Sequence, residues 1–184
     1  MAMGNKVVDI IPPKDIWVGN ENAGLVITQF VDYEDDGCYK AHDIVVKLVE
    51  EFDRDVKFVF RHFPLTKIHQ RAHKAAEAAV AAAQEGKFWQ MHNLIFRNRR
   101  NMGITSLKEY AKEAGVVNKK FLTELMDSVY GWTVRNDLLE GLDMGVREVP
   151  AFFLNDERYK GKITYESMRK AVLEKLKESK VKRA

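Results

Sequence analysis

Two short apolar segments separated by an amphipathic stretch constrain the fold of this chain most. Residues 25–30 (Leu-Val-Ile-Thr-Gln-Phe) and 56–60 (Val-Lys-Phe-Val-Phe) have the length and composition of buried strands. Between them, apolar residues recur at helical spacing over about 37–52. A strand, a helix and a second strand over this length predict a right-handed parallel βαβ unit.

The rest of the chain reads as a run of helices followed by a hairpin and a last helix. From residue 69 to about 144 the apolar period stays helical. Residues 151–154 (Ala-Phe-Phe-Leu) then predict a strand, and Asn155-Asp156 predicts a two-residue turn into a returning strand at 157–160. Apolar residues from Tyr165 to Leu176 define the final helix.

Charge and hydropathy exclude two classes of partner. The chain has 30 Lys and Arg against 27 Asp and Glu, and both signs are interspersed, so no nucleic-acid partner is predicted. No segment approaches the roughly 20 apolar residues that span a bilayer, so no membrane insertion is predicted. The opening residues 1–6 carry no apolar run of signal-peptide length, and we expect a cytoplasmic protein unless a signal was removed.

The chain has a single cysteine, and its position is informative. Cys38 ends the segment Asp35-Asp36-Gly37-Cys38, where the first predicted strand runs into the first predicted helix. An intramolecular disulfide needs two sulfur atoms, so dithiol cycling within one chain is excluded. The residue three positions before Cys38 is Asp35.

Several segments in the same order resemble the DsbA-like family of thiol-disulfide oxidoreductases, in the thioredoxin superfamily. The similarity covers roughly residues 25–175. It is carried by Asp-Tyr-Glu at 32–34, Ala41-His42, Phe-Arg-His-Phe-Pro-Leu at 60–65, Ala-Ala-Glu-Ala-Ala at 75–79, Gly-Lys-Phe-Trp-Gln-Met-His at 86–92 and Val-Pro-Ala-Phe-Phe-Leu-Asn at 149–155.

The resemblance implies an α/β thioredoxin fold, βαβ … ββα, with a four-stranded mixed sheet. It implies one domain over 1–184, with an inserted multi-helix subdomain at 66–146. Relatives of this kind include thioredoxin-like domains attached to some sodium/proton antiporters.

The resemblance also assigns roles to the active loop. Asp35 stands where the family has its attacking cysteine, and Cys38 keeps the position of the resolving, catalytic cysteine. The implied substrate-binding residues are Asp35, Asp36, Gly37, Val149 and Pro150. A cis bond before Pro150 would place the backbone of Val149 beside the loop, where an extended peptide can pair with it.

The loop chemistry favours slow monothiol reactions at most. A helix N-terminus favours a thiolate, but the carboxylates of Asp35 and Asp36 disfavour a second negative charge on Cys38. The expected partners are protein or peptide thiols and disulfides, or glutathione, and no cofactor is predicted apart from possible glutathione.

Several readings of the loop stay open. Asp35-Asp36-Gly37 is also what a simple helix cap and turn require, and a free cysteine is commonly an inert core residue. The chain could be a non-catalytic peptide- or partner-binding regulatory module. It could also be a glutathione-dependent isomerase or transferase similar to the kappa-class enzymes.

The histidines raise a metal hypothesis, which the spacing does not support. Cys38 and His42 are four residues apart, as are His69 and His73. Zinc needs three or four convergent ligands, and two pairs on separate helices do not provide them. No metal site is predicted.

Overall fold

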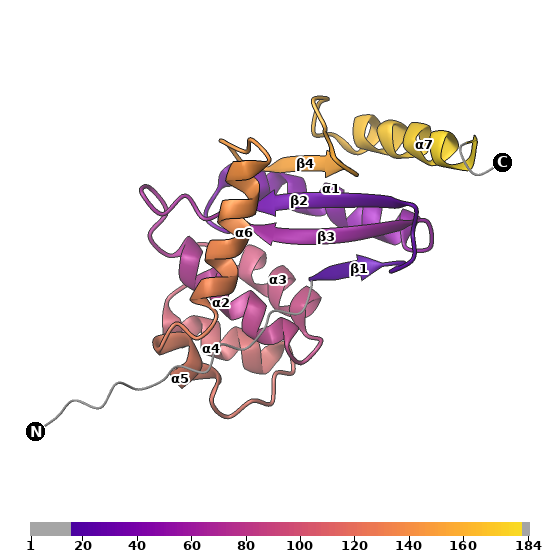
Figure 1. Cartoon of the computed structure of the whole chain (residues 1–184). Helices are drawn as coiled ribbons and strands as arrows, with labels where there is room; N and C mark the ends of the chain where they lie inside the picture. The colour runs from indigo at the N-terminus through magenta and orange to yellow at the C-terminus, as the bar shows by residue number, and fades with distance from the viewer. Residues whose placement is uncertain (1–15, 182–184) are drawn as a thin grey trace, which may run out of the picture.

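The computed structural model describes residues 16–181. The opening residues 1–6, on which the expectation of no signal peptide rests, lie outside this range. In chain order the elements are β1 (Trp17–Gly19), β2 (Leu25–Val31), α1 (Asp36–Phe52), β3 (Val56–His62), α2 (Ala72–Ala83), α3 (Phe88–Arg97), α4 (Ile104–Glu113), α5 (Phe121–Met126), α6 (Gly131–Asp143), β4 (Ala151–Leu154), β5 (Glu157–Arg158) and α7 (Tyr165–Val181) (Figure 1).

The strands form one mixed sheet in the order β1-β3-β2-β4-β5. β2 and β3 are parallel, so the predicted βαβ unit is confirmed, and β4 runs antiparallel to β2 with Phe30 opposite Ala151. The prediction of four strands was wrong, because β1 adds a fifth strand antiparallel to β3. β1 has three residues, which is too short for an alternating pattern, and its pairing with β3 defines it.

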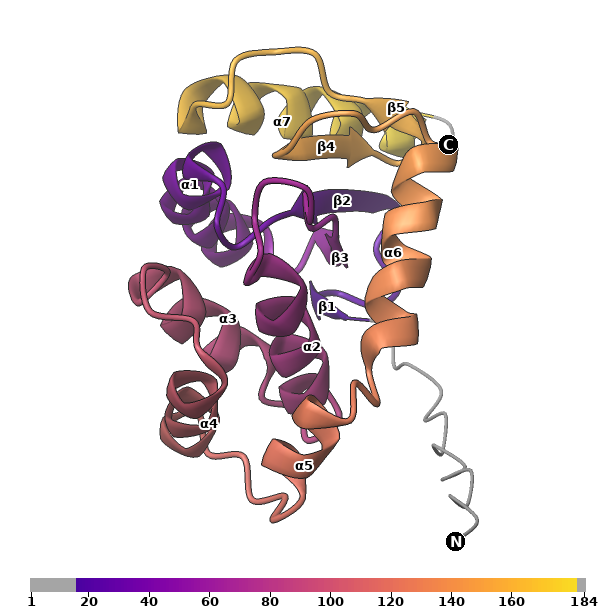
Figure 2. The same cartoon turned by 90° about the vertical axis from the view of Figure 1, so that its left-hand side faces the viewer.

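Helices cover both faces of the sheet, with α1 and α7 on one face and α6 on the other (Figure 2). Alternate side chains of β2 point to the two faces of the sheet. Leu25 and Ile27 belong to the larger core, whereas Phe30 packs with Phe63 and Phe153 in a smaller core. This two-sided burial explains why the strand reads as a nearly continuous apolar run.

Helix α6 approaches the sheet closely because Gly141 has no side chain. A Cβ atom at this position would lie 2.7 Å from Phe63 Cδ2 and 2.9 Å from Phe30 Cε1. The aromatic rings of Phe30 and Phe63 meet edge to face, with centroids 6.2 Å apart. The backbone of α6 therefore lies directly on the rings of the smaller core.

Helices α2 to α5 form a separate group of helices beside the sheet, between β3 and α6 in the chain (Figure 1). Most of α2 is buried, which fits its many alanines, because small side chains allow neighbouring helices to approach closely. The fully buried Glu77 lies on this helix, with its Oε1 atom 3.0 Å from Lys74 Nζ. Phe88 is part of the larger core and Trp89 packs against it.

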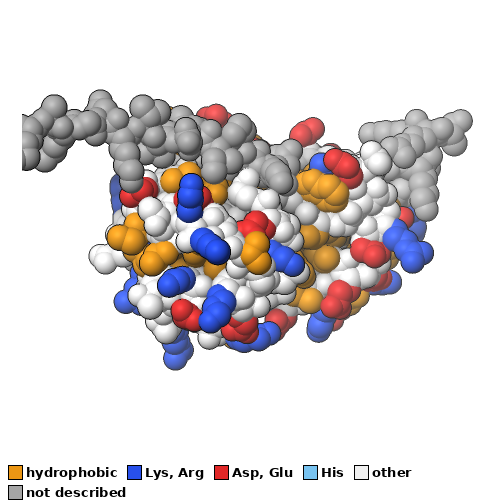
Figure 3. Space-filling model, turned by 90° about the horizontal axis from the view of Figure 1, so that it is seen from below, with side chains coloured by type: hydrophobic (Ala, Val, Ile, Leu, Met, Phe, Trp, Pro, Cys, Tyr) orange, Lys and Arg blue, Asp and Glu red, His pale blue; other side chains and the backbone are white. Residues whose placement is uncertain are grey.

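The surface carries both charge signs. On the face drawn in Figure 3, basic and acidic side chains are interspersed. Within residues 16–181, no helix is both long enough and apolar enough to cross a membrane.

Candidate functional site

The site begins where β2 runs into α1, and Asp35 caps that helix. Asp35 has an extended backbone (φ −72°, ψ 131°), and its Oδ1 atom accepts a 2.7 Å hydrogen bond from the backbone N–H of Cys38. The sequence did not decide which residue of Asp35-Asp36-Gly37 caps the helix, and in the structure the N-cap is Asp35. A carboxylate at this position satisfies a free N–H group and lies at the positive end of the helix dipole.

Cys38 lies beneath this cap and is fully buried. Its Sγ atom accepts a hydrogen bond from the backbone N–H of Asp32 at 3.4 Å. Burial raises the pKa of the Cys38 thiol far above its ordinary value; the Asp32 N–H lowers it in part, and the carboxylates of Asp35 and Asp32 raise it. The sulfur is therefore a neutral thiol at physiological pH, and it is shielded from solvent.

The cis-proline loop lies against the same turn of α1. The Val149–Pro150 peptide bond is cis. A Cβ atom on Gly37 would lie 2.9 Å from Pro150 Cδ, 3.0 Å from Asp35 Oδ1 and 3.7 Å from the Val149 carbonyl oxygen. The structure thus brings together the predicted site residues Asp35, Gly37, Val149 and Pro150, and Cys38 lies one residue after Gly37.

We expect Gly37→Ala to destabilise this contact between the loop and the proline. The added methyl group must displace the Pro150 ring or the Asp35 carboxylate, which costs about 1–3 kcal/mol for an overpacked site. Urea unfolding of the two proteins measures the difference. Gly103→Ala is the comparison, because a Cβ atom there meets nothing within 4 Å and the change costs only the preference for glycine over alanine at the N-cap of α4. A Gly37→Ala protein as stable as the wild type would contradict the close approach of Pro150.

Asp36 points away from this contact. Its side chain is 72% exposed and forms an ion pair with Arg99, which lies just after α3. The same Arg99 guanidinium lies over the ring of Tyr39, 4.7 Å from its centroid. Asp36 therefore joins the first turn of α1 to the segment that follows α3.

The sequence did not assign a site role to Asp32 and Glu34, although both organise the loop. The buried Asp32 carboxylate accepts hydrogen bonds from the N–H groups of Glu34 (2.7 Å) and Leu65 (2.8 Å), and it lies 2.8 Å from His69 Nδ1. The Glu34 carboxylate accepts the N–H groups of Arg71 and Ala72 at the start of α2. The signal was present in the Asp-Tyr-Glu segment, but apart from the local Glu34 N–H the partners are more than 30 residues away in the chain.

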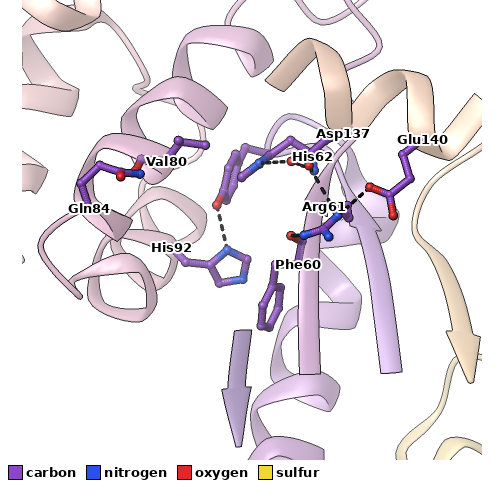
Figure 4. A network of polar contacts seen from close by, with 9 residues as sticks. Phe60, Arg61, His62, Val80, Gln84, His92, Asp137 and Glu140 are labelled. Carbon is purple, nitrogen blue, oxygen red and sulfur yellow. Dashed lines mark hydrogen bonds and ion pairs between the residues drawn. The ribbon is translucent and has the colours of Figure 1, made fainter. Parts of the chain in front are cut away.

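A buried cluster of aromatic and histidine side chains includes His62 and His92 (Figure 4). The Tyr33 hydroxyl and His92 Nδ1 are 2.8 Å apart, and His92 stacks on Trp89. Burial lowers the pKa of His92 well below its ordinary value, with a further lowering from His42 and His62, so its ring is neutral near pH 7.

His62 belongs to a second part of this network, which reaches α6. Its Nδ1 atom and its backbone N–H both lie 3.0 Å from Asp137 Oδ2 (Figure 4). The adjacent Arg61 donates to Glu140 at 2.9 Å. These contacts fix the end of β3 against α6.

The histidine pairs that raised the metal hypothesis have separate partners. His69 contacts Asp32, whereas His73 Nε2 lies 3.3 Å from Glu77 Oε1. Within residues 16–181, no three or more His, Cys, Asp or Glu side chains gather in a way that could hold a metal ion.

Comparison with known proteins identifies the family to which this chain belongs. A family model described as "Thioredoxin" matches residues 12–174, which is most of the chain. The chain belongs to the thioredoxin family.

Solved structures of thiol-disulfide exchange proteins have the same fold. BdbD from Bacillus subtilis, in its oxidised form, superposes with a TM-score of 0.80 over 90% of this chain and 96% of that one, at 20% identity. The thiol-disulfide exchange protein alpha-DsbA2 from Wolbachia pipientis gives a TM-score of 0.74 over 87% and 86%, at 22% identity. The predicted DsbA-like thioredoxin fold is confirmed.

A curated relative is much longer. The chain is 30% identical over 167 residues to the Na(+)/H(+) antiporter NhaA 3 of Salinispora tropica. The aligned region covers 91% of this chain and 26% of that protein. The chain thus spans about a quarter of the length of the curated relatives that it matches.

Proposed function

We propose that this chain is a DsbA-like protein of thiol-disulfide oxidoreductase ancestry, whose single-cysteine site has at most weak monothiol activity. The observation that carries the proposal is the burial of the Cys38 sulfur beneath a loop in which Asp35 occupies the helix cap. On the same turn Asp36 is exposed and Asp35 is partly exposed, and neither carboxylate can attack a disulfide.

The chemistry of exchange explains why the activity is weak. A thiolate must attack one sulfur of a disulfide, so that a new S–S bond forms and the other sulfur leaves as a thiolate. A second thiol must then release the mixed disulfide. Cys38 would have to become exposed and lose its proton before the first step, and an external thiol such as glutathione would have to perform the second.

A specific observation favours peptide or partner binding as the function that remains. A pocket of about 450 Å³ adjoins Pro150 and includes Glu148, Phe152 and Arg158 in its lining. It lies on β4 and the hairpin, beside the loop that contacts Gly37. An extended peptide can bind such a surface through its backbone without any cysteine chemistry.

We expect the wild-type chain to reduce insulin at close to the uncatalysed rate. With glutathione as the reductant, the rate should stay within about twofold of a reaction without protein, because no exposed thiolate is available. Insulin turbidity measures this, and a dithiol member of the family serves as the positive control. Brisk turnover by the wild-type chain would overthrow the proposal.

The binding function has its own test, which uses Cys38→Ser. If partner binding requires no thiol chemistry, pull-downs with this variant and with the wild type should recover the same proteins. Partners that disappear with Cys38→Ser would show that they are held through the sulfur, and they would favour the monothiol function over simple binding.

The proposal places the protein in a reducing compartment, and its partners are protein or peptide chains. One cysteine without a disulfide needs no oxidising environment. Glutathione enters the proposal only as the external thiol that would resolve a mixed disulfide.

A further inference from the structure

A basic pocket lies beside the first turn of α1 and shares no lining residue with the pocket at Pro150. Residues 96–101, at the end of α3 and just after it, line this pocket together with Tyr39 of α1. Its volume is about 360 Å³, within the range of small binding pockets. The lining contains three arginines, two asparagines and two aromatic rings, and it includes no Asp or Glu.

One of the three arginines is held in place by several contacts. The Arg99 guanidinium lies 4.7 Å from the centroid of the Tyr39 ring, pairs with Asp36 and reaches the Glu34 carbonyl oxygen at 3.4 Å. Arginine so fixed presents its remaining N–H groups in a defined direction. It also connects the pocket to the residue that precedes Gly37, and Gly37 contacts Pro150.

The other two arginines are available to a ligand. Arg97 and Arg100 are exposed, and neither forms an ion pair with another residue of the described range 16–181. Of the acidic side chains nearby, Asp36 pairs with Arg99 and Glu34 accepts the N–H groups at the start of α2, whereas Asp43 lines an adjoining pocket with Arg97. A fourth guanidinium, that of Arg71, donates to the Arg100 carbonyl oxygen at 3.4 Å, which adds to the positive charge.

We propose that this pocket binds carboxylate side chains of an acidic peptide that lies across the first turn of α1. Planar guanidinium groups bind carboxylates through paired N–H bonds, and carboxamide groups can add further donors. Arg99 and Pro150 flank the same turn, so one extended segment can contact both. This inference rests on the proposed peptide-binding function and specifies the chemistry of the partner.

Fluorescence anisotropy on the full wild-type chain tests this inference. The probes are three fluorescein-labelled peptides with identical apolar residues, whose variable positions are all Glu, all Gln or all Lys. We expect the Glu peptide to bind about tenfold more tightly than the Gln peptide at low salt, with the difference shrinking at physiological salt. The Lys peptide should bind most weakly.

Paired substitutions locate the effect. The double variant Arg97→Gln/Arg100→Gln should reduce the affinity for the Glu peptide to that for the Gln peptide and leave the Gln peptide unchanged. Arg54→Gln is the matched control, because Arg54 is exposed and follows the opposite end of α1. It should keep the full preference for the Glu peptide.

The outcomes separate this inference from the proposed function. Equal binding of the Glu and Gln peptides overturns the acidic ligand but leaves the peptide-binding function standing. A preference for Glu that survives Arg97→Gln/Arg100→Gln places the carboxylates elsewhere and also overturns the inference. If none of the three peptides binds, both the inference and the peptide-binding function fail, whereas the insulin assay still reports on the redox proposal.

Discussion

Asp35→Cys should convert this chain into an active disulfide reductase. We expect the rate of insulin reduction to rise by about two orders of magnitude or more over the wild type, because a thiol at a helix N-terminus is readily ionised and attacks disulfides. The new sulfur would occupy the capping position, where Asp35 now accepts the N–H of Cys38. Cys38, three residues on, would then supply the second thiol.

Two matched variants make this prediction sharp. Asp35→Ser can keep the cap without a thiol, so it should stay inactive and correct for any loss of the capping interaction, which is worth about 0.5–2 kcal/mol. Asp35→Cys/Cys38→Ser can attack but cannot resolve, so it should accumulate mixed disulfides with the substrate. A folded Asp35→Cys protein with background activity would contradict the assignment of position 35 to the attacking residue.

The second large effect is the protection of Cys38 from alkylation. We expect iodoacetamide to react with the native protein about a thousandfold or more slowly than with the urea-unfolded chain, because the sulfur is reached only when the structure opens. Its exposed fraction is 0%, and burial raises the pKa of the thiol, so both access and ionisation are suppressed. Mass spectrometry over time measures both rates.

A control thiol on the same turn shows whether burial causes the slow alkylation of Cys38. The Asp36 side chain is 72% exposed, so Asp36→Cys in a Cys38→Ser background should react at similar rates in the folded and unfolded chains. If Cys38 itself reacts equally fast in both states, the thiol is accessible. Burial would then not be what limits the monothiol activity of Cys38.

The sequence predicted the sheet and its helices well wherever burial leaves a pattern. β2, β3 and β4 are buried on both faces, so each appears as an apolar run, and α1 shows a clear helical period. β1 leaves no such pattern, because three residues are too few and its pairing with β3 depends on the folded structure. The count of four strands failed for that reason.

The candidate site, too, was predicted from the sequence in part and missed in part. Local chemistry pointed to an aspartate cap, and the resemblance pointed to Val149-Pro150, which the structure places against Gly37. The partners of Asp32 could not be predicted, since Leu65 and His69 meet it only after the chain has folded back. The basic pocket was missed as well, because it requires the end of α3 to lie beside Tyr39 of α1.

Asp32 and Glu34 have a mechanical consequence for the whole molecule. Both carboxylates belong to the short connection between β2 and α1, yet they hold the residues that lead from β3 into α2. The group of helices α2 to α5 cannot swing relative to the sheet without breaking these bonds. The sheet and these helices are therefore tied together at the same segment whose Asp32 N–H donates to the buried sulfur.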